Sequence, residues 1–181
     1  LTEGISRLAG EYPSLRFSLE YKPKEPRTHS YLARMADTLL VAIETGASNI
    51  GVTIDTGHAY VAGEVVGESI VLASRAGNRL FHMHFNDNHA SWDDDMIVGS
   101  LRLTEYIEMF YSLRKVGYDG FVSVDIFPYR EDQYEATRQS VLNMKKYDEI
   151  IDGIGMSKLG DVIENGDPCE MVRVIREAAF K

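Results

Sequence analysis

The chain has a single cysteine, Cys169, only five prolines and no long hydrophobic segment. One cysteine cannot close an intrachain disulfide, which excludes a disulfide-stapled secreted domain and suits the reducing cytoplasm. No apolar run approaches the roughly 18 residues that a membrane-spanning helix needs. We therefore expect a cytoplasmic protein without a membrane partner.

Basic residues are also scarce. Lys and Arg number 19 against 28 Asp and Glu, which gives a formal net charge of −9. Nucleic acids and anionic membranes both carry phosphate and repel such a chain, so we expect neither as the main partner. A length of 181 residues and a hydrophobic content of 44% are typical of one globular domain with a substantial core.

Short β-branched strand patterns alternate four times with longer helical patterns. The predicted strands cover residues 15–21, 49–55, 79–86 and 120–127. The predicted helices cover residues 30–45, with Ser30 as N-cap and Gly46 as C-cap, then 63–76, 103–116 and 132–146. This alternation predicts parallel βαβ units over residues 1–150. Two short helices are expected over residues 151–181, the second beginning at Asp167-Pro168.

Each predicted strand ends in a side chain that can bind a metal ion: Glu20, Asp55, His84 and Asp125. The carboxyl ends of parallel strands meet at one edge of the sheet, where α/β proteins carry their chemistry. Three carboxylates and one imidazole suit a hard divalent ion such as Mn²⁺, Mg²⁺ or Co²⁺ better than a thiolate zinc site. The sequence therefore predicts a cation site at this edge.

An acidic loop with three consecutive aspartates, residues 93–95, follows the third predicted strand. Neighbouring carboxylates repel one another, so the loop is either a solvated face or the wall of a cation site. If the strand ends hold one cation, His58, Asp93 and Asp95 can hold a second, while Asp94 faces water.

The remaining histidines and the single tryptophan give weaker signals. His82 shares a strand face with His84, and we expect it in the core or supporting a metal ligand. His29 and His89 are expected to be solvated. Trp92 either packs over a sugar-sized cleft or anchors its loop, and both interpretations stay open.

Four motifs together point to a known family. They are EYKPKEP at 20–26, DTGHAY at 55–60, HFND at 84–87 with DDDMIVGS at 93–100, and VSVDIF at 122–127. From about residue 15 to 145 the chain resembles the C-terminal half of the xylose isomerase-like (β/α)₈ TIM barrels. It is most similar to the L-rhamnose isomerase type of bacterial sugar isomerase.

The resemblance implies a two-metal site. One divalent cation, Mn²⁺ before Mg²⁺, Co²⁺ or Zn²⁺, would bind the four strand-end residues. A second would share Asp55 and bind His58, Asp93 and Asp95. Lys22 matches the lysine that touches the substrate carbonyl oxygen, so Lys22, His58, Asp93 and Asp95 are the expected catalytic residues.

The leading hypothesis is an aldose–ketose isomerase that moves a hydride between C1 and C2 of an open-chain, unphosphorylated sugar. One alternative is a ketose 3-epimerase with a single metal, and another is a non-catalytic sugar-binding half-barrel. An apurinic endonuclease is disfavoured, because it needs more histidine ligands and a basic surface than this acidic chain with five histidines offers.

The chain begins at Leu1, and four strands are half of the eight in a barrel of about 250 residues. We therefore expect it to be a piece of a protein of roughly 300 residues or more. Four open strands would expose two edges and an apolar inner face. Self-association, or the missing N-terminal half of the barrel, is expected to cover them.

Overall fold

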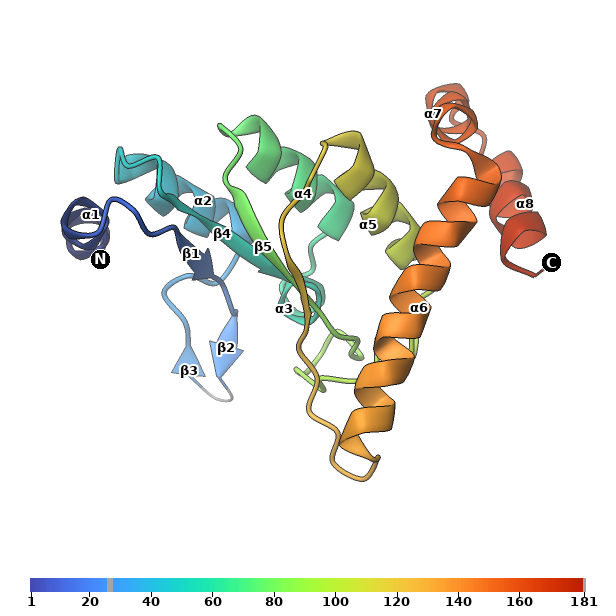
Figure 1. Cartoon of the computed structure of the whole chain (residues 1–181), viewed down its shortest axis with the longest axis horizontal. Coiled ribbons are helices and arrows are strands. Elements are labelled where there is room, and N and C mark those ends of the chain that lie inside the picture. Colours follow the sequence, from blue (N-terminus) through green and yellow to red (C-terminus); the bar gives the residue numbers. More distant parts are fainter. Residues whose placement is uncertain (26–27, 181) are drawn as a thin grey trace.

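The fold is built on a sheet of four parallel strands (Figure 1). The computed structural model describes residues 1–25 and 28–180. The sheet has the order β1-β4-β5-β6, with β1 (Phe17–Glu20), β4 (Ile50–Asp55), β5 (Leu80–Phe85) and β6 (Val122–Val124). A separate antiparallel hairpin pairs β2 (Lys24–Glu25) with β3 (Thr28–His29). The predicted α/β class with four parallel βα units is confirmed.

The helices of the described residues are α1 (Thr2–Glu11), α2 (Met35–Glu44), α3 (Thr56–Val61), α4 (Val66–Arg75), α5 (Thr104–Lys115), α6 (Gln133–Ile154), α7 (Met156–Asn165) and α8 (Pro168–Ala179). Three of them, α2, α4 and α5, cover one face of the sheet. Figure 1 shows α2, α4 and α5 side by side above the strands, with α7 and α8 at the far end of α6. Within the described residues no helix is long and apolar enough to cross a membrane. A cytoplasmic location stays a prediction.

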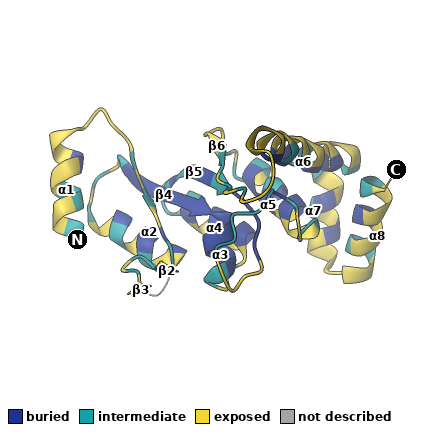
Figure 2. Cartoon of the chain, turned by 90° about the horizontal axis from the view of Figure 1, so that it is seen from below, coloured by how far each residue is buried: buried dark blue, intermediate teal, exposed yellow. Residues whose placement is uncertain are grey.

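The core lies between the sheet and these helices. Alternate residues of β4 (Ile50, Val52 and Ile54) are fully buried there, as are Met83 and Phe85 of β5. Figure 2 shows β4 buried along its whole length. Burying one such side chain stabilises the fold by about 1.5–3 kcal/mol, so these residues hold the middle of the sheet in place.

The opposite face of the sheet was predicted to be apolar, and this was wrong. It carries polar side chains that pair between neighbouring strands. The Ser18 and Thr53 hydroxyl oxygens lie 2.6 Å apart, and His82 Nε2 lies 2.8 Å from Ser123 Oγ. Polar groups that bond to one another across strands need no apolar cover. Self-association therefore gains no support from this face and stays a prediction.

The hairpin after β1 was not predicted, and it displaces the start of α2. The Ser30 N–H donates to the Pro23 carbonyl oxygen at 3.2 Å, which keeps Ser30 in the hairpin. α2 therefore begins at Met35, whose N–H donates to the Glu64 carboxylate at 2.9 Å. At the other end Gly46 follows the helix with a φ of 68°, a conformation that favours glycine.

Other boundaries differ by a few residues. The segment after β4 forms the short helix α3, to which the sequence analysis assigned no element. β6 ends at Val124, and α6 continues past the expected end near Lys146 to Ile154. α8 begins at Pro168 with Asp167 as its N-cap, as predicted. The division of the chain at residue 150 stays a prediction.

Candidate metal centre

The carboxyl ends of the four parallel strands bring four side chains together. Glu20 ends β1, Asp55 ends β4, His84 lies near the end of β5, and Asp125 directly follows β6. One possible ligand atom from each lies within 4.8 Å of the others. His84 Nδ1, for example, lies 3.1 Å from Asp125 and 3.4 Å from Glu20. We refer to these four residues as the strand-end group.

A second cluster, the loop group, consists of Asp55, His58 of α3 and Asp93 of the acidic loop. Its ligand atoms also lie within 4.8 Å of one another, and Asp93 Oδ2 is 3.2 Å from His58 Nε2. Asp95, the fourth residue predicted for this cation, is in neither group. The role of all seven residues as ligands stays a prediction.

Asp55 belongs to both groups and is fully buried. Its carboxylate accepts hydrogen bonds from the His58 N–H at 2.9 Å and from Asn86 Nδ2 at 2.8 and 3.0 Å. Burial raises the pKa of Asp55 to about 6, although His58 and Asn86 act to lower it. A Cβ on Gly57 would lie 2.1 Å from Asn86 Oδ1. The glycine of the DTGH motif therefore leaves room for the amide that orients Asp55.

His58 is held with Nε2 toward the site. Its Nδ1 donates to the Tyr21 carbonyl oxygen at 2.8 Å, so Nε2 faces Asp93. Burial lowers the pKa of His58, but the hydrogen bond to Asp93 and the charges of Asp55, Asp93 and Glu20 outweigh this and raise it to about 9. The protonated ring thus offsets part of the negative charge of the cluster at neutral pH.

Lys22 places an ammonium group beside Asp93. Its Nζ lies 2.9 Å from Asp93 Oδ2 and also pairs with Glu25. Burial raises the pKa of Asp93, but its contacts with His58 and Lys22 outweigh this and lower the pKa to about 2. Asp93 is therefore ionised at any working pH. Pro26, which ends the motif containing Lys22, lies outside the described residues.

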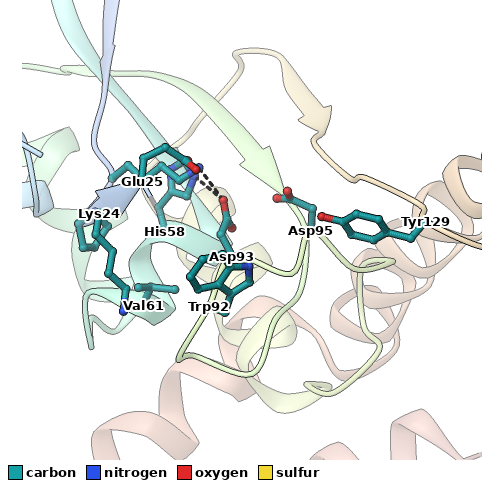
Figure 3. A pocket seen from close by; sticks show the side chains of 10 residues that line it. Lys24, Glu25, His58, Val61, Trp92, Asp93, Asp95 and Tyr129 are labelled. Carbon is teal, nitrogen blue, oxygen red and sulfur yellow. Dashed lines mark hydrogen bonds and ion pairs between the residues drawn. The ribbon is translucent and has the colours of Figure 1, made fainter. Parts of the chain in front are cut away.

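Asp95 faces the same pocket from the other side. Figure 3 shows its carboxylate apart from Asp93, with the Tyr129 hydroxyl pointing toward it. Burial and the negative charges of Asp93, Asp55 and Asp125 raise the pKa of Asp95 to about 7. A carboxyl group that resists ionisation reflects an excess of negative charge at this edge.

The chemistry of these residues fits a divalent cation. His84 Nδ1 and Asp93 Oδ1 are buried without a hydrogen-bond partner, and buried polar atoms are normally paired. A cation would satisfy both atoms and would also offset the surplus of carboxylates. Oxygen-rich donor sets with single imidazoles suit Mn²⁺, Mg²⁺ or Co²⁺. Which of these ions binds stays a proposal.

The acidic loop is anchored by Asp87, which the sequence analysis did not single out. Its backbone pairs with that of Met96 through hydrogen bonds of 3.0 and 2.8 Å. Its buried carboxylate accepts from the Leu101 N–H at 2.8 Å and pairs with the Arg102 guanidinium. That guanidinium also lies 3.8 Å from the centre of the Tyr60 ring. The position of Asp87 in the HFND motif was the one available signal.

The weaker candidates take supporting or peripheral places. His82 bonds Ser123, as noted above, and its ring centre lies 4.9 Å from that of His84. His89 is exposed and bonds Asp94, whose carboxylate accepts from the His89 backbone N–H and lies 3.0 Å from its Nδ1. Asp94 is thus the one of the three aspartates that turns away from the pocket.

The Asp87 anchor yields a stability prediction. Asp87→Asn keeps the shape of the side chain but leaves the Arg102 charge unpaired next to buried groups. We expect the free energy of unfolding, measured in urea, to fall by about 3 kcal/mol. Asp94→Asn, which removes only an exposed pair with His89, should change it by less than about 1 kcal/mol. Equal effects of the two variants would contradict the anchoring role.

Cation binding should release a proton. Below a pH of about 9 the His58 ring is protonated, and a cation needs its neutral form. Affinity for Mn²⁺ should therefore rise with pH from 7 toward 9 and level off above it. Calorimetric titrations at pH 7 in two buffers of different ionisation enthalpy measure the released protons. His58→Asn should lower this number by about one, and unchanged proton release in that variant would refute the prediction.

Comparison with known proteins identifies the family. The family model described as xylose isomerase-like TIM barrel matches residues 4–147. An uncharacterized protein of Methanocaldococcus jannaschii is 27% identical over 148 residues, which cover 81% of this chain and 47% of that protein. The xylose isomerase of Thermus thermophilus is 32% identical over 123 residues, which cover 66% of this chain and 31% of that enzyme. The chain thus spans less than half the length of these relatives.

Solved structures show the same fold. A D-tagatose 3-epimerase-like protein has a TM-score of 0.69 at 24% identity, over 83% of this chain and 53% of that one. The IOLI protein with a bound zinc atom has a TM-score of 0.57 at 16% identity, over 83% of this chain and 54% of that one. Since the family model covers most of the sequence, we conclude that this chain belongs to the xylose isomerase-like TIM barrel family.

Proposed function

We propose that this chain carries the metal centre of an aldose–ketose isomerase that acts on an open-chain, unphosphorylated sugar. The observation that supports this most is the loop group, which adds His58 and Asp93 to the strand-end group through the shared Asp55. In a single-metal enzyme the loop group would bind no cation of its own. The 32% identity to a xylose isomerase points the same way, whereas the specific L-rhamnose isomerase likeness rests on the sequence motifs alone.

In this proposal the strand-end group and the loop group each hold one divalent cation. Cations bound there would polarise the carbonyl and hydroxyl oxygens of the sugar. The Lys22 ammonium, which stands beside Asp93, stabilises the negative charge that develops on the carbonyl oxygen. The wall of the pocket between the cation sites and Lys22 would hold C1 and C2 of the sugar in place for the transfer of hydrogen.

Asp95 is the group that accepts and returns the proton in this mechanism. Its carboxylate lies in the pocket but in neither ligand group. It takes the proton from the C2 hydroxyl of the aldose while the hydrogen on C2 moves to C1 as a hydride. It then returns that proton to the oxygen on C1, which completes the ketose without net gain or loss of atoms.

The second candidate is a ketose 3-epimerase, favoured by the structural similarity to a D-tagatose 3-epimerase-like protein. Such a reaction needs two groups that exchange a proton with one carbon from opposite sides. Glu20 and Asp125 flank His84 Nδ1 at 3.4 and 3.1 Å and are the carboxylates available for it. In this case Asp93 would have no catalytic task.

Single substitutions in each group distinguish the two functions. Asp93→Asn alters the loop group alone, and Asp125→Asn alters the strand-end group alone. For the isomerase we expect calorimetry with Mn²⁺ to show one site lost in each variant, and turnover of aldoses to fall at least about 100-fold in both. Asp94→Asn, in the same loop but bonded to His89, is the matched control and should behave as the unchanged protein.

The labelling of the product gives an independent test. Hydride transfer leaves little solvent deuterium on carbon, whereas proton exchange in an epimerase incorporates it at C3. Mass spectrometry of products formed in D₂O, from a panel of pentoses and hexoses with Mn²⁺, measures this. Full deuterium incorporation together with an active Asp93→Asn variant would overturn the isomerase in favour of the epimerase.

A further inference from the structure

His58 and Asp93 of the loop group face a pocket of about 200 Å³ whose far wall has no role in the proposed reaction. Its inner part is lined by Lys22, His58 and Asp93, the residues of the reaction centre. Its outer part is lined by Lys24, Val61 and Trp92 (Figure 3). Figure 3 shows Trp92 directly beside Asp93, with Val61 and Lys24 on the side away from Asp95.

The polar contacts that anchor the loop do not depend on Trp92. The loop is closed by Asp87 through Met96, Leu101 and Arg102, and none of these contacts involves Trp92. The indole is also 48% exposed, whereas the large side chains that hold this fold together are buried. A half-exposed tryptophan in the wall of a pocket offers a flat apolar surface to a ligand.

The other two residues of the outer wall complete a surface suited to a carbon chain that bears hydroxyl groups. Val61 adds apolar area at the end of α3. Lys24 lies on the β2–β3 hairpin, and within the described part of the chain no carboxylate forms an ion pair with its ammonium group. The ammonium group can therefore donate hydrogen bonds to hydroxyl oxygens.

We propose that Trp92, Val61 and Lys24 form a subsite for the carbons of an open-chain sugar beyond C3. The C–H face of the chain packs on the indole and on Val61, and Lys24 binds a distal hydroxyl. This inference rests on the proposed function, because C1 and C2 must lie at Lys22 and Asp93 for the distal carbons to reach Trp92. It makes Trp92 a binding residue that sets how long a sugar the site prefers.

The fluorescence of the protein reports on this subsite directly, because Trp92 is the only tryptophan of the chain. The protein is first saturated with Mg²⁺, which is diamagnetic and leaves indole emission in place. Acyclic polyols, which lack a carbonyl and cannot react, are then added. Xylitol, with five carbons, should shift the emission to shorter wavelength with a saturable dependence on concentration. Glycerol, with three carbons, should produce no saturable shift.

Three variants test the subsite by affinity. Trp92→Ala should weaken xylitol binding, measured by calorimetry, about 10-fold. Trp92→Phe keeps a flat aromatic face and should remain within about 3-fold of the unchanged protein. Phe121→Ala, which removes an exposed aromatic residue that does not line this pocket, is the matched control and should have no effect. Mg²⁺ binding should be unchanged in all three, which shows that the adjacent Asp93 is still in place.

The outcomes separate the subsite from the reaction. If xylitol binds by calorimetry but leaves the emission of Trp92 unchanged, or binds Trp92→Ala as well as the unchanged protein, the subsite is refuted and the isomerase proposal stands. If Trp92 binds the distal carbons of the sugar, Trp92→Ala should raise KM in turnover assays with little change in kcat. If no aldose is converted and no polyol binds, the proposed function fails together with the subsite.

Discussion

The buried carboxylate of Asp55 is the constraint on which the rest of this site depends. It ends the central strand β4 and accepts hydrogen bonds from the start of α3 and from Asn86. A carboxylate so far from water is costly unless its charge is met by donors or cations. The same group is the one residue common to both ligand clusters. Its position therefore fixes the spacing between any ions that these clusters hold.

The charge around Asp55 is balanced by residues brought from several elements. The protonated His58 and the Lys22 ammonium lower the pKa of Asp93, while Asp95, farther from them, has its pKa raised to about 7. Asp93 and Asp95 thus differ in pKa because only Asp93 contacts His58 and Lys22. In the proposed mechanism Asp93 therefore binds a cation and Asp95 transfers the proton.

The two clusters differ in how firmly the fold holds them. The strand-end group lies on or next to strands whose alternate residues form the core, so its geometry follows from the sheet. The loop group depends on Asp93, whose place is set by the Asp87–Arg102 pair and by Lys22. Under the proposed function, substrate preference is therefore expected to change more readily through the loop, which also carries Trp92, than through the strand ends.

The sequence by itself determined the strand-end group and most of the helices and strands. Apolar residues recur at every second position in the strands and at about every 3.6 positions in the helices, and this alternation predicts parallel βα units. The carboxyl ends of parallel strands meet at one edge of the sheet. That is why Glu20, Asp55, His84 and Asp125 could be placed together before any coordinates.

The hairpin, the late start of α2 and the polar open face of the sheet could not be predicted from the sequence, because they depend on bonds between distant segments. Those bonds include Met35 to Glu64 and Ser18 to Thr53. For the same reason only the tertiary structure separated Asp93 from Asp95: these two identical side chains of one loop differ in which distant residues they meet.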